Sequence, residues 1–454
     1  MIVVSHRGPI AFTSRPGGGF TTARGGGGLV SALTPLIEGR DDVRWIAAAI
    51  SAGDRAAIAA GAADVEGFNL DLVAPDPTQH RLHYDVISNA TLWFLFHDLF
   101  DLPRRPRLDQ HFRTAWDAYR AVNEVFADAV CEQAPRDDVV LIQDLHFLLL
   151  PGMVRQRRPD LRLAHFMHTP FCGADSIRIL PDDVTIELLT SMAAAPAGFH
   201  TERWAAAYRS CVDEVLGRPP PAGTFVTTFG PDLVSLTKVA RSAPAEAAGE
   251  QLASRIGDRA LIFRTDRIEL SKNIPRGFLA FERLLEVRPE WRERVVFAAF
   301  VYPSREGLPE YLAYRQEVEH TARRVNERWA TSSWQPILLD TRDDFPRSVA
   351  GLERADVLFV NPLRDGLNLV AKEGPLLSRR DVVVCLSRGA GAFDELREGV
   401  VEVHAFDLEQ NATALHNALT MAPAERARRG RILRTAAGAN PATAWLDEQV
   451  ACAT

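Results

Sequence analysis

The chain lacks the charge balance and the long apolar runs of a nucleic-acid-binding or membrane protein. Its 454 residues include 52 lysines and arginines against 59 aspartates and glutamates, a formal net charge of -7. This balance gives no basic field for a polyanion, so we expect no nucleic acid partner. No apolar run reaches the roughly eighteen residues of a spanning helix, so we expect no membrane partner. Polar residues interrupt the opening apolar run at Ser5, so we expect no secretory leader.

Cysteines and metal-ligand clusters are also scarce. The 5 cysteines are scattered and form no CxxC pair, which is typical of a reducing compartment, so we expect a cytoplasmic protein. His165 and His168 are spaced like a metal pair, but no carboxylate or cysteine cluster completes a ligand set. We therefore expect no metal and no other cofactor. Composition leaves the oligomeric state open, a homo-oligomer included.

The glycine-rich stretches lack the signatures of the common nucleotide-binding loops. No Lys-Ser or Lys-Thr follows the glycines at residues 25–28, and no complete dinucleotide fingerprint is present. Consecutive glycines nevertheless let backbone N–H groups approach a phosphate, which makes Gly27 and Gly28 candidate donor-binding residues. A flexible surface loop has the same composition, so the glycines alone do not decide between the two interpretations.

The chain does contain a repeated alternation of short apolar strands with helical patterns. Strands are predicted at residues 2–5, 45–50, 139–142, 163–166, 224–228, 261–263, 295–301, 357–360 and 382–385. This alternation predicts an α/β fold of parallel sheets flanked by helices. Prolines near residue 220 mark a linker. We therefore predict an amino-terminal domain over residues 1–222, a carboxy-terminal domain over residues 223–435, and a terminal helix within residues 436–454.

The strongest functional signal follows the strand predicted at residues 357–360. Ligands of open α/β sheets bind beyond the carboxyl ends of the strands, where the start of a helix favours an anion. Gly366 permits a tight turn there, and Glu373 lies about two helical turns further on, in reach of a ribose diol. An ordinary strand, turn and helix with solvated acids would share this pattern. The candidate nucleotide-sugar residues are Asp365, Gly366, Asn368, Leu369 and Glu373.

Two cations follow another predicted strand, on a loop that leads into a helix. Arg267 can grip two phosphate oxygens at once, and Lys272 supplies a compact positive charge. Together they suit the negative charge that develops on a leaving nucleoside diphosphate. Taken singly, each residue is equally compatible with an ordinary solvated side chain.

These segments, with others in the same order, resemble the trehalose-6-phosphate synthase family, most of all its actinobacterial members. The resemblance runs from about residue 2 to about residue 450. It implies a retaining glycosyltransferase with two Rossmann-like domains facing across a cleft, the GT-B architecture. Such enzymes transfer glucose from a nucleotide donor to glucose 6-phosphate without a metal. The matching segments are Ser5-His-Arg7, residues 24–29, Tyr84 with Ser88-Asn89 and Trp93, Gln143-Asp-Leu-His146, His168-Thr-Pro-Phe171, residues 267–272, Ser304-Arg305 and residues 365–373.

The resemblance implies a role for each matched residue. Arg267 and Lys272 would bind the donor diphosphate, together with backbone N–H groups. Asp365 and His168 would bind the transferred glucose, and Glu373 would bind the ribose. The backbone groups would be those of Gly28, Asn368 and Leu369.

The resemblance also implies an acceptor site. Two guanidinium groups, a phenol and an indole N–H would meet the phosphate of the acceptor. Asp144 would orient the acceptor sugar, and the terminal helix would pack back on the first domain. The residues implied for the acceptor phosphate are Arg7, Tyr84, Trp93 and Arg305.

The segment at residues 340–347 departs from the aromatic nucleobase loop of the enterobacterial members. It is charged, and its aromatic residue, Phe345, is displaced. Asp343 or Asp344 would accept from the N1–H and the exocyclic amine of guanine. We therefore expect GDP-glucose as the donor, with UDP-glucose as the alternative.

Two other functions remain open. A related enzyme of the same family couples a nucleotide-cyclitol to an aminocyclitol phosphate and shares the donor motifs. A non-catalytic sugar-phosphate sensor is the second. A sensor is free to lose Arg267, Lys272 or Glu373, and all three are present. The same-family transferases therefore account better for the sequence.

Overall fold

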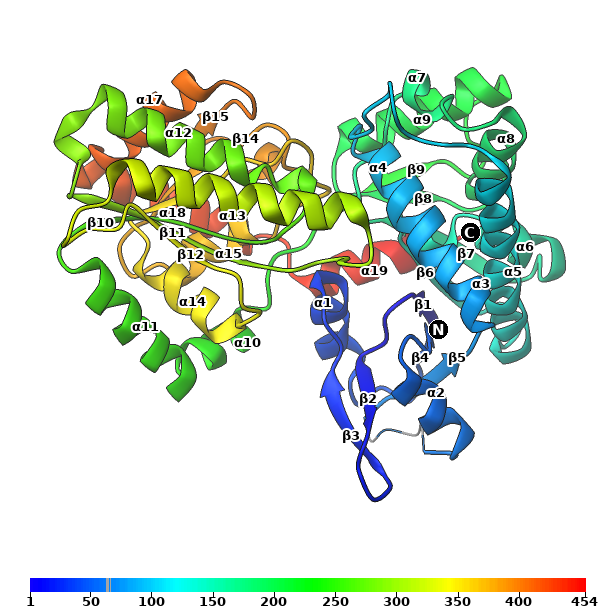
Figure 1. The fold of residues 1–454 in the computed structure, drawn as a ribbon. Helices are drawn as coiled ribbons and strands as arrows, with labels where there is room; N and C mark the ends of the chain where they lie inside the picture. Colours follow the sequence, from blue (N-terminus) through cyan, green and yellow to red (C-terminus); the bar gives the residue numbers. More distant parts are fainter. Residues whose placement is uncertain (63–64, 66) are drawn as a thin grey trace. The chain divides into compact units, whose positions relative to one another are not determined.

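The structure is a computed structural model that describes residues 1–62, 65 and 67–454. It divides into two compact units, Met1–Phe229 with Ala442–Thr454, and Gly230–Pro441 (Figure 1). Each unit is built on a parallel sheet with helices packed against it, so the predicted α/β class is confirmed. The first unit extends past the predicted boundary at residue 222, because strand β9 (Thr224–Val226) pairs with β8 (Ala197–Phe199) in its sheet.

The sheet of the first unit has seven strands in the order β5-β4-β1-β6-β7-β8-β9. This is the doubly wound Rossmann order, in which the chain reverses its direction of winding between β1 and β6. An antiparallel hairpin, β2 (Ile10–Ser14) with β3 (Phe20–Arg24), projects from the unit (Figure 1). The remaining strands are β1 (Ile2–Ser5), β4 (Arg44–Ala48), β5 (Asn69–Val73), β6 (Val139–Gln143) and β7 (Arg162–Met167).

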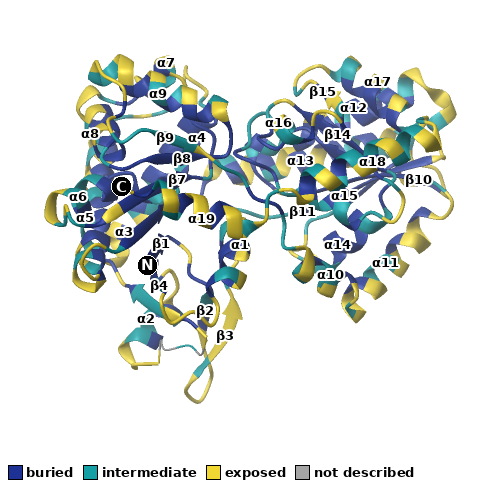
Figure 2. Cartoon of the chain, turned by 180° about the vertical axis from the view of Figure 1, so that it is seen from behind, coloured by how far each residue is buried: buried dark blue, intermediate teal, exposed yellow. Residues whose placement is uncertain are grey.

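The helices of the first unit bury apolar faces against this sheet (Figure 2). Helix α5 (Gln110–Gln133) starts at Asp109, whose side chain accepts from two backbone N–H groups, and it buries Phe126 in the core. The others are α1 (Gly28–Ile37), α2 (Ala52–Ala59), α3 (Pro77–Arg81), the π-helix η1 (Leu82–Leu92), α4 (Trp93–Phe96), the 3₁₀ helix η2 (Leu145–Phe147), α6 (Leu150–Arg157), α7 (Ala174–Ile177), α8 (Asp182–Met192) and α9 (Glu202–Leu216).

The terminal helix α19 (Ala442–Cys452) belongs to the first unit, where it packs against α1, β6 and β7. Trp445 is fully buried, and its ring meets that of Phe166 edge to face at 5.3 Å. Trp445 and Gln449 of this helix thereby lie beside the carboxyl ends of β7 and β6.

The sheet of the second unit has six strands in the order β12-β11-β10-β13-β14-β15, again the Rossmann order. Its winding reverses between β10 (Ala260–Arg267) and β13 (Val357–Val360). The other strands are β11 (Val295–Tyr302), β12 (Ile337–Asp340), β14 (Val383–Ser387) and β15 (Val401–Val403). The helices are α10 (Leu233–Ala240), α11 (Ala243–Ile256), η3 (Leu270–Lys272), α12 (Ile274–Val287), η4 (Pro289–Trp291), α13 (Pro309–Trp329), α14 (Phe345–Arg354), α15 (Val370–Leu377), α16 (Phe393–Leu396), α17 (Leu408–Leu419) and α18 (Pro423–Gly438).

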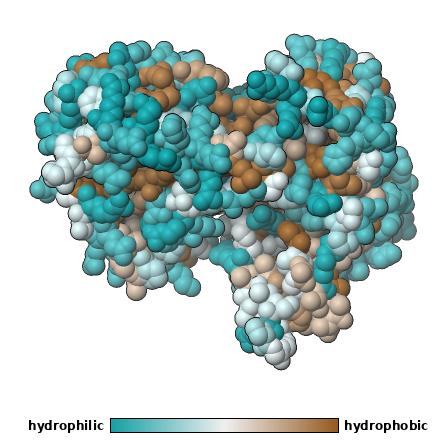
Figure 3. All heavy atoms as spheres, viewed as in Figure 1, coloured by the Kyte–Doolittle hydropathy of each residue, from teal (hydrophilic) through white to brown (hydrophobic). Residues whose placement is uncertain are grey.

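Most of the surface that faces the viewer in Figure 3 is hydrophilic, and apolar side chains are interspersed with polar ones. Within the described ranges, no helix combines the length and the apolar character that crossing a membrane requires.

Candidate active site

Strands β10 and β13 bring the predicted donor residues together at their carboxyl ends. Arg267 is the last residue of β10, Lys272 ends the short helix η3, and Asp365 follows β13. The Nζ atom of Lys272 lies 2.6 Å from Oδ2 of Asp365. Asn368 Nδ2 donates to the same oxygen at 3.0 Å. Because the winding of the sheet reverses between these two strands, the residues lie where open α/β sheets bind their ligands.

The turn before α15 differs in detail from the prediction. We expected Gly366 to provide the tight turn, but the left-handed conformation falls on Asn368, with φ of 79°. The Asn368 side chain accepts from the Ala371 N–H at 3.1 Å and so satisfies a donor of the first helical turn. Gly366 is close-packed, since a Cβ on the neighbouring Gly391 would overlap its carbonyl oxygen.

Lys272 stays charged despite its burial. Burial lowers the pKa of this ammonium group, but the carboxylates of Asp365, Asp266 and Glu269 outweigh that effect, and the pKa is raised above its ordinary value. Lys272 therefore offers a permanent positive charge to a ligand.

A buried arginine fixes the backbone beneath Lys272. Arg264, 1% exposed, donates to Oδ2 of Asp266 at 2.7 Å and to Oδ1 of Asn361 at 3.0 Å. It also donates to the Lys272 carbonyl oxygen at 2.9 Å. The position of Lys272 is thus set by a charged network under the sheet end.

Glu373 lies half-buried in the first turn of α15. Burial raises its pKa from 4.5 to about 7. In the part of the chain that the structure describes, no group donates a hydrogen bond to this carboxylate. A desolvated carboxylate without a hydrogen-bond donor is stabilised by any ligand that donates to it, such as the two hydroxyls of a ribose.

One buried carboxylate, that of Glu269, contacts both the arginine predicted for the donor and an arginine predicted for the acceptor phosphate. Nη1 of Arg267 lies 3.1 Å from Oε1 of Glu269, and Nη1 of Arg305 lies 2.6 Å from the same oxygen. Arg305 also donates to the hydroxyl of Tyr311 at 2.9 Å. The sequence analysis missed Glu269. The available signal was its place two residues after Arg267, which puts it at the same sheet edge.

Asp343 and Asp344, in the loop predicted to contact the nucleobase, lie in different environments. Asp344 accepts from the Arg347 N–H at 3.0 Å and is the N-cap of α14. Asp343 is exposed, and within the described residues its carboxylate has no hydrogen-bond or ion-pair partner. Phe345, 50% exposed, is the first residue of the helix. Asp343 is therefore the aspartate of the pair that is available to a base.

Asp343 acts electrostatically on the end of β11. Burial raises the pKa of Tyr302 there, Arg267 lowers it, and Asp343 raises it further. Asp343 and Arg267 therefore both lie close enough to Tyr302 to shift its pKa. The loop that contains Asp343 is thus near the predicted donor cation Arg267.

The acceptor residues are divided between the units: Arg7, Tyr84 and Trp93 belong to the first unit and Arg305 to the second. Arg7 is exposed just beyond β1, at the strand where the winding of the first sheet reverses. The Ser5 hydroxyl donates to the Arg7 carbonyl oxygen at 2.7 Å and accepts from the Trp45 indole at 2.8 Å.

The glycine loop lies next to Arg7. A Cβ on Gly26 would lie 3.7 Å from Nη1 of Arg7, and a Cβ on Gly25 would overlap the carbonyl oxygen of Gly8. Gly27, with φ of 116°, precedes α1, which begins at Gly28. The close packing of the loop on Gly8 therefore requires a residue without a side chain at Gly25.

Tyr84 is placed through His6. Their rings stack at 4.6 Å with an interplanar angle of 8°, and His6 stacks equally closely on His146. Burial, followed by the neighbouring histidines, holds the pKa of His6 well below its ordinary value. Trp93 is buried, at 3% exposed, and stacks on His97 at 4.1 Å.

A chain of side-chain hydrogen bonds fixes His168. Gln143 Nε2 donates to Oε1 of Gln449 at 2.9 Å. This bond sets the orientation of the Gln143 amide, so its Oε1 accepts from Nε2 of His168 at 3.0 Å. Nε2 of His200 lies 3.3 Å from Nδ1 of His168. The His168 backbone N–H donates to Oδ1 of Asp144 at 3.2 Å. Burial lowers the pKa of His168 to about 3, so the ring is neutral and carries its proton on Nε2.

His165 contacts the backbone of Asp144. Its Nε2 lies 3.1 Å from the carbonyl oxygen of Asp144, and burial lowers its pKa to about 4. No group of three or more His, Cys, Asp or Glu side chains that could hold a metal ion is found among the described residues.

Residues 1–453 match the model of glycosyltransferase family 20. The chain belongs to this family. It is 32% identical to a trehalose-6-phosphate synthase of Mycolicibacterium vanbaalenii, over 98% of this chain and 94% of the relative. It is 29% identical to the UDP-forming α,α-trehalose-phosphate synthase A of Dictyostelium discoideum, over 98% of this chain but 61% of that longer protein.

A solved structure of the family has the same fold. The UDP-forming α,α-trehalose-phosphate synthase of Burkholderia xenovorans, in complex with glucose-6-phosphate, is 26% identical, with a TM-score of 0.82. The alignment covers 99% of this chain and 98% of the other. The resemblance stated from the sequence motifs and the predicted two-Rossmann fold are both confirmed.

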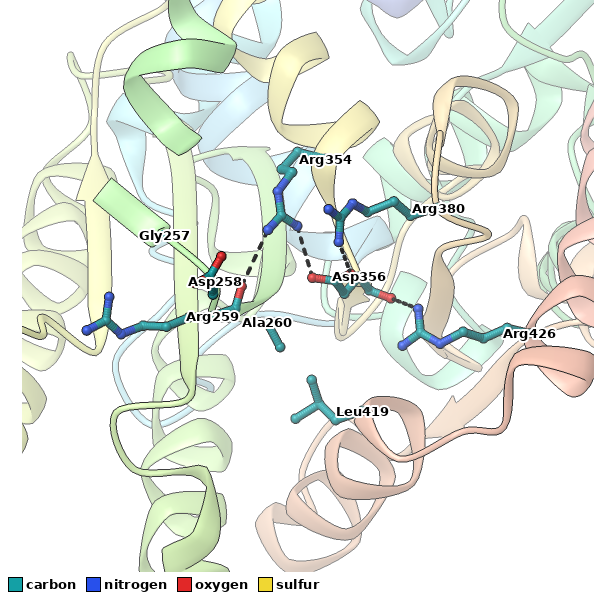
Figure 4. A pocket seen from close by; sticks show the side chains of 9 residues that line it. All are labelled: Gly257, Asp258, Arg259, Ala260, Arg354, Asp356, Arg380, Leu419 and Arg426. Carbon is teal, nitrogen blue, oxygen red and sulfur yellow. Dashed lines mark hydrogen bonds and ion pairs between the residues drawn. The ribbon is translucent and has the colours of Figure 1, made fainter. Parts of the chain in front are cut away.

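A separate cavity of about 340 Å³ lies at the opposite ends of β10 and β13 in this family 20 protein. Arg354 and Arg380 donate to the carboxylate of Asp356, and Arg426 donates to its carbonyl oxygen (Figure 4). These arginines connect the starts of the strands to neighbouring helices. The predicted donor residues Arg267, Lys272 and Asp365 lie at the carboxyl ends of the same strands.

Proposed function

We propose that this family 20 glycosyltransferase transfers glucose from a nucleotide-glucose to glucose 6-phosphate and forms α,α-trehalose 6-phosphate. The observation that carries the proposal is the convergence of Arg267, Lys272 and Asp365 at the winding reversal of the second sheet. Two cations at that point suit a diphosphate, and a carboxylate beside them suits sugar hydroxyls.

The donor would be bound at several points along its length. Arg267 and Lys272 would contact the diphosphate, together with backbone N–H groups at Gly28, Asn368 and Leu369. Glu373 would accept from the ribose hydroxyls, which is supported by its lack of a hydrogen-bond donor among the described residues.

The reaction would proceed with retention and without a protein nucleophile. The bond between the anomeric carbon and the phosphate oxygen breaks as the acceptor hydroxyl attacks from the same face. The acceptor proton passes to the leaving phosphate oxygen, and the new glycosidic bond forms. Arg267 and Lys272 stabilise the charge that develops on the diphosphate, a task that requires no metal.

The acceptor phosphate would be met by Arg7, Tyr84, Trp93 and Arg305, and Asp144 would orient the acceptor sugar. The exposed guanidinium of Arg7 beside the glycine loop supports this role. His168, held neutral, would contribute a ring edge near the 6-hydroxyl of the transferred glucose.

GDP-glucose is the donor we propose, since Asp343 offers an exposed carboxylate to the N1–H and amine of guanine. The support for guanine comes from this loop and not from the names of relatives, because the Dictyostelium and Burkholderia proteins are named UDP-forming.

The experiment is product formation from glucose 6-phosphate with GDP-, UDP- and ADP-glucose in parallel, in buffer that contains EDTA. NMR of the product reads the linkage and the anomeric configuration. An α,α-1,1-linked disaccharide phosphate with GDP-glucose preferred is the expected result. Preference for UDP-glucose would overturn the base assignment alone. Nucleotide binding without product would overturn the acceptor assignment and favour the cyclitol-coupling activity, and no nucleotide binding would favour a sensor.

A further inference from the structure

Glu269 occupies an unusual place in the candidate site. It is 2% exposed, and its Oε1 atom accepts from Arg305 at 2.6 Å and from the Ser304 hydroxyl at 3.1 Å. The same oxygen forms an ion pair with Nη1 of Arg267 at 3.1 Å. A single buried oxygen thus contacts three polar groups, two of them cationic. Without this carboxylate, two guanidinium groups would face each other across a short distance.

The two arginines belong to different substrates under the proposed function. Arg267 ends β10 beside the donor cation Lys272, whereas Arg305 lies beyond β11 and belongs to the acceptor set. Arg305 also adopts a left-handed backbone conformation, with φ of 48°, which is uncommon for a residue with a side chain. Its bonds to Glu269 and Tyr311 hold the side chain in that position.

We propose that Glu269 is a positioning residue that fixes the spacing between the donor arginine and the acceptor arginine. This inference rests on the proposed function, since it takes Arg267 to contact the donor diphosphate and Arg305 to contact the acceptor phosphate. The reacting atoms belong to two phosphorylated sugars, so their separation is set by the separation of the groups that grip the phosphates. A displacement of about 1 Å in such groups lowers turnover by roughly a hundredfold.

The same unit contains a matched control. Glu282, on α12, is also buried and also holds two arginines of α13, Arg324 at 2.5 Å and Arg328 at 3.0 Å. It lies within a helix on the face of the sheet, away from the carboxyl ends of β10 and β13. Glu269→Gln and Glu282→Gln therefore remove comparable buried charges, and Glu269 alone contacts the proposed substrate-binding arginines.

The experiment compares kcat, both KM values and Tm of the parent, Glu269→Gln and Glu282→Gln. We expect both variants to lose thermal stability. Glu269→Gln should in addition lower kcat by about tenfold to a hundredfold and raise the KM for donor and for acceptor. Glu282→Gln should keep the parent kinetic constants. In an Arg305→Ala background, Glu269→Gln should no longer raise the KM for glucose 6-phosphate, because the group it positions is gone.

Glu269→Asp provides a second test that preserves the charge. The shorter side chain should keep the protein folded but draw the arginines out of place, so both KM values should rise. The inference is overturned if folded Glu269→Gln or Glu269→Asp has parent kinetic constants, which would leave Glu269 a purely structural role. Failure of the parent enzyme to form product would instead overturn the proposed function itself.

Discussion

Lys272 and Asp365 are 93 residues apart in the sequence, yet the Lys272 ammonium lies 2.6 Å from Oδ2 of Asp365. The pair joins the ends of two adjacent strands, β10 and β13. Each residue is assigned to a different part of the donor, the lysine to the diphosphate and the aspartate to the glucose. Under the proposed function, the Asp365 carboxylate therefore competes with the donor phosphate for the lysine.

This competition predicts opposite effects of Asp365→Asn on binding and on turnover. Loss of the charge should tighten binding of the nucleoside diphosphate severalfold, because Lys272 becomes free to meet phosphate. Glucose transfer should fall by roughly 10- to 100-fold, the worth of a charged hydrogen bond. Calorimetry with GDP and UDP measures the first effect, and initial rates measure the second. Asp381→Asn, which breaks a pair with Arg434 on α18, is the control. Weaker diphosphate binding by Asp365→Asn would show that Asp365 does not compete with phosphate for Lys272.

Arg267→Ala should separate catalysis from stability. The side chain is 46% exposed, so its loss should move Tm little. Turnover should fall by about 10²- to 10³-fold, because the guanidinium acts where negative charge develops on the leaving group. Rates at saturating substrate and a thermal melt of the same samples check both claims. Arg379→Ala, a 70% exposed arginine paired with Glu353, should behave like the parent. A parent rate for Arg267→Ala would refute the role.

Much of this arrangement was predictable because its signals are local in the sequence. Apolar strands followed by turn residues marked the ends of β1, β6, β10 and β13, at or just beyond which Arg7, Asp144, Arg267 and Asp365 lie. The pairing of Lys272 with Asp365 required the strand order, which no local pattern contains. Strand β8 was missed because it has only 3 residues, of which Ala197 and Gly198 are of types that disfavour strands. The role of Glu269 could not be predicted, because its contact with Arg305 depends on the pairing of β10 with β11.

Glu373 should make donor binding depend on pH. Its pKa of about 7 means that the carboxylate is mostly protonated at pH 6 and mostly ionised at pH 8. Because the ionised form accepts better from the ribose, the KM for donor should fall about tenfold over that interval, as expected for one ionisation. Glu373→Gln should flatten the profile. A pH-independent KM for the parent would show that this carboxylate does not bind the donor.

The raised pKa of Glu373 should also make the stability of the fold depend on pH. Stability should fall as the pH rises, whereas donor binding should improve. The folded pKa lies above the ordinary value of 4.5, so the folded state binds more protons than the unfolded state between these two values. Stability contributed by protonated Glu373 is therefore lost as the pH rises from about 4.5 through 7. Glu373→Gln should be more stable than the parent at pH 8 and lose this advantage at pH 4.5. Thermal melts across the range check the prediction, and equal shifts at both ends would contradict it.

The two aspartates of the nucleobase loop should have separable effects. Asp343→Asn should shift the ratio of kcat/KM between GDP-glucose and UDP-glucose by about 10-fold or more, because a charged acceptor for guanine is lost. Asp344→Ala should leave that ratio unchanged and cost about 1 kcal/mol of stability, since it removes the cap of α14. Competition assays with both donors, together with denaturant unfolding, distinguish the roles. An altered donor ratio in Asp344→Ala alone would reverse the assignment.

Gln449 should influence His168 from a distance. Its side chain fixes the orientation of the Gln143 amide, which in turn keeps the His168 proton on Nε2. Gln449→Leu leaves the Gln143 amide group without this buried acceptor, at a cost of roughly 1–3 kcal/mol, and frees the amide to flip. We expect kcat to fall by about tenfold, the usual scale for loss of a residue that orients another, with a changed ¹⁵N NMR signature of the His168 tautomer. Glu448→Gln, exposed on the same helix, is the control. Because a purely structural role for α19 would lower Tm without changing the tautomer, an unchanged His168 spectrum in folded Gln449→Leu would show that the terminal helix stabilises the unit without orienting the site.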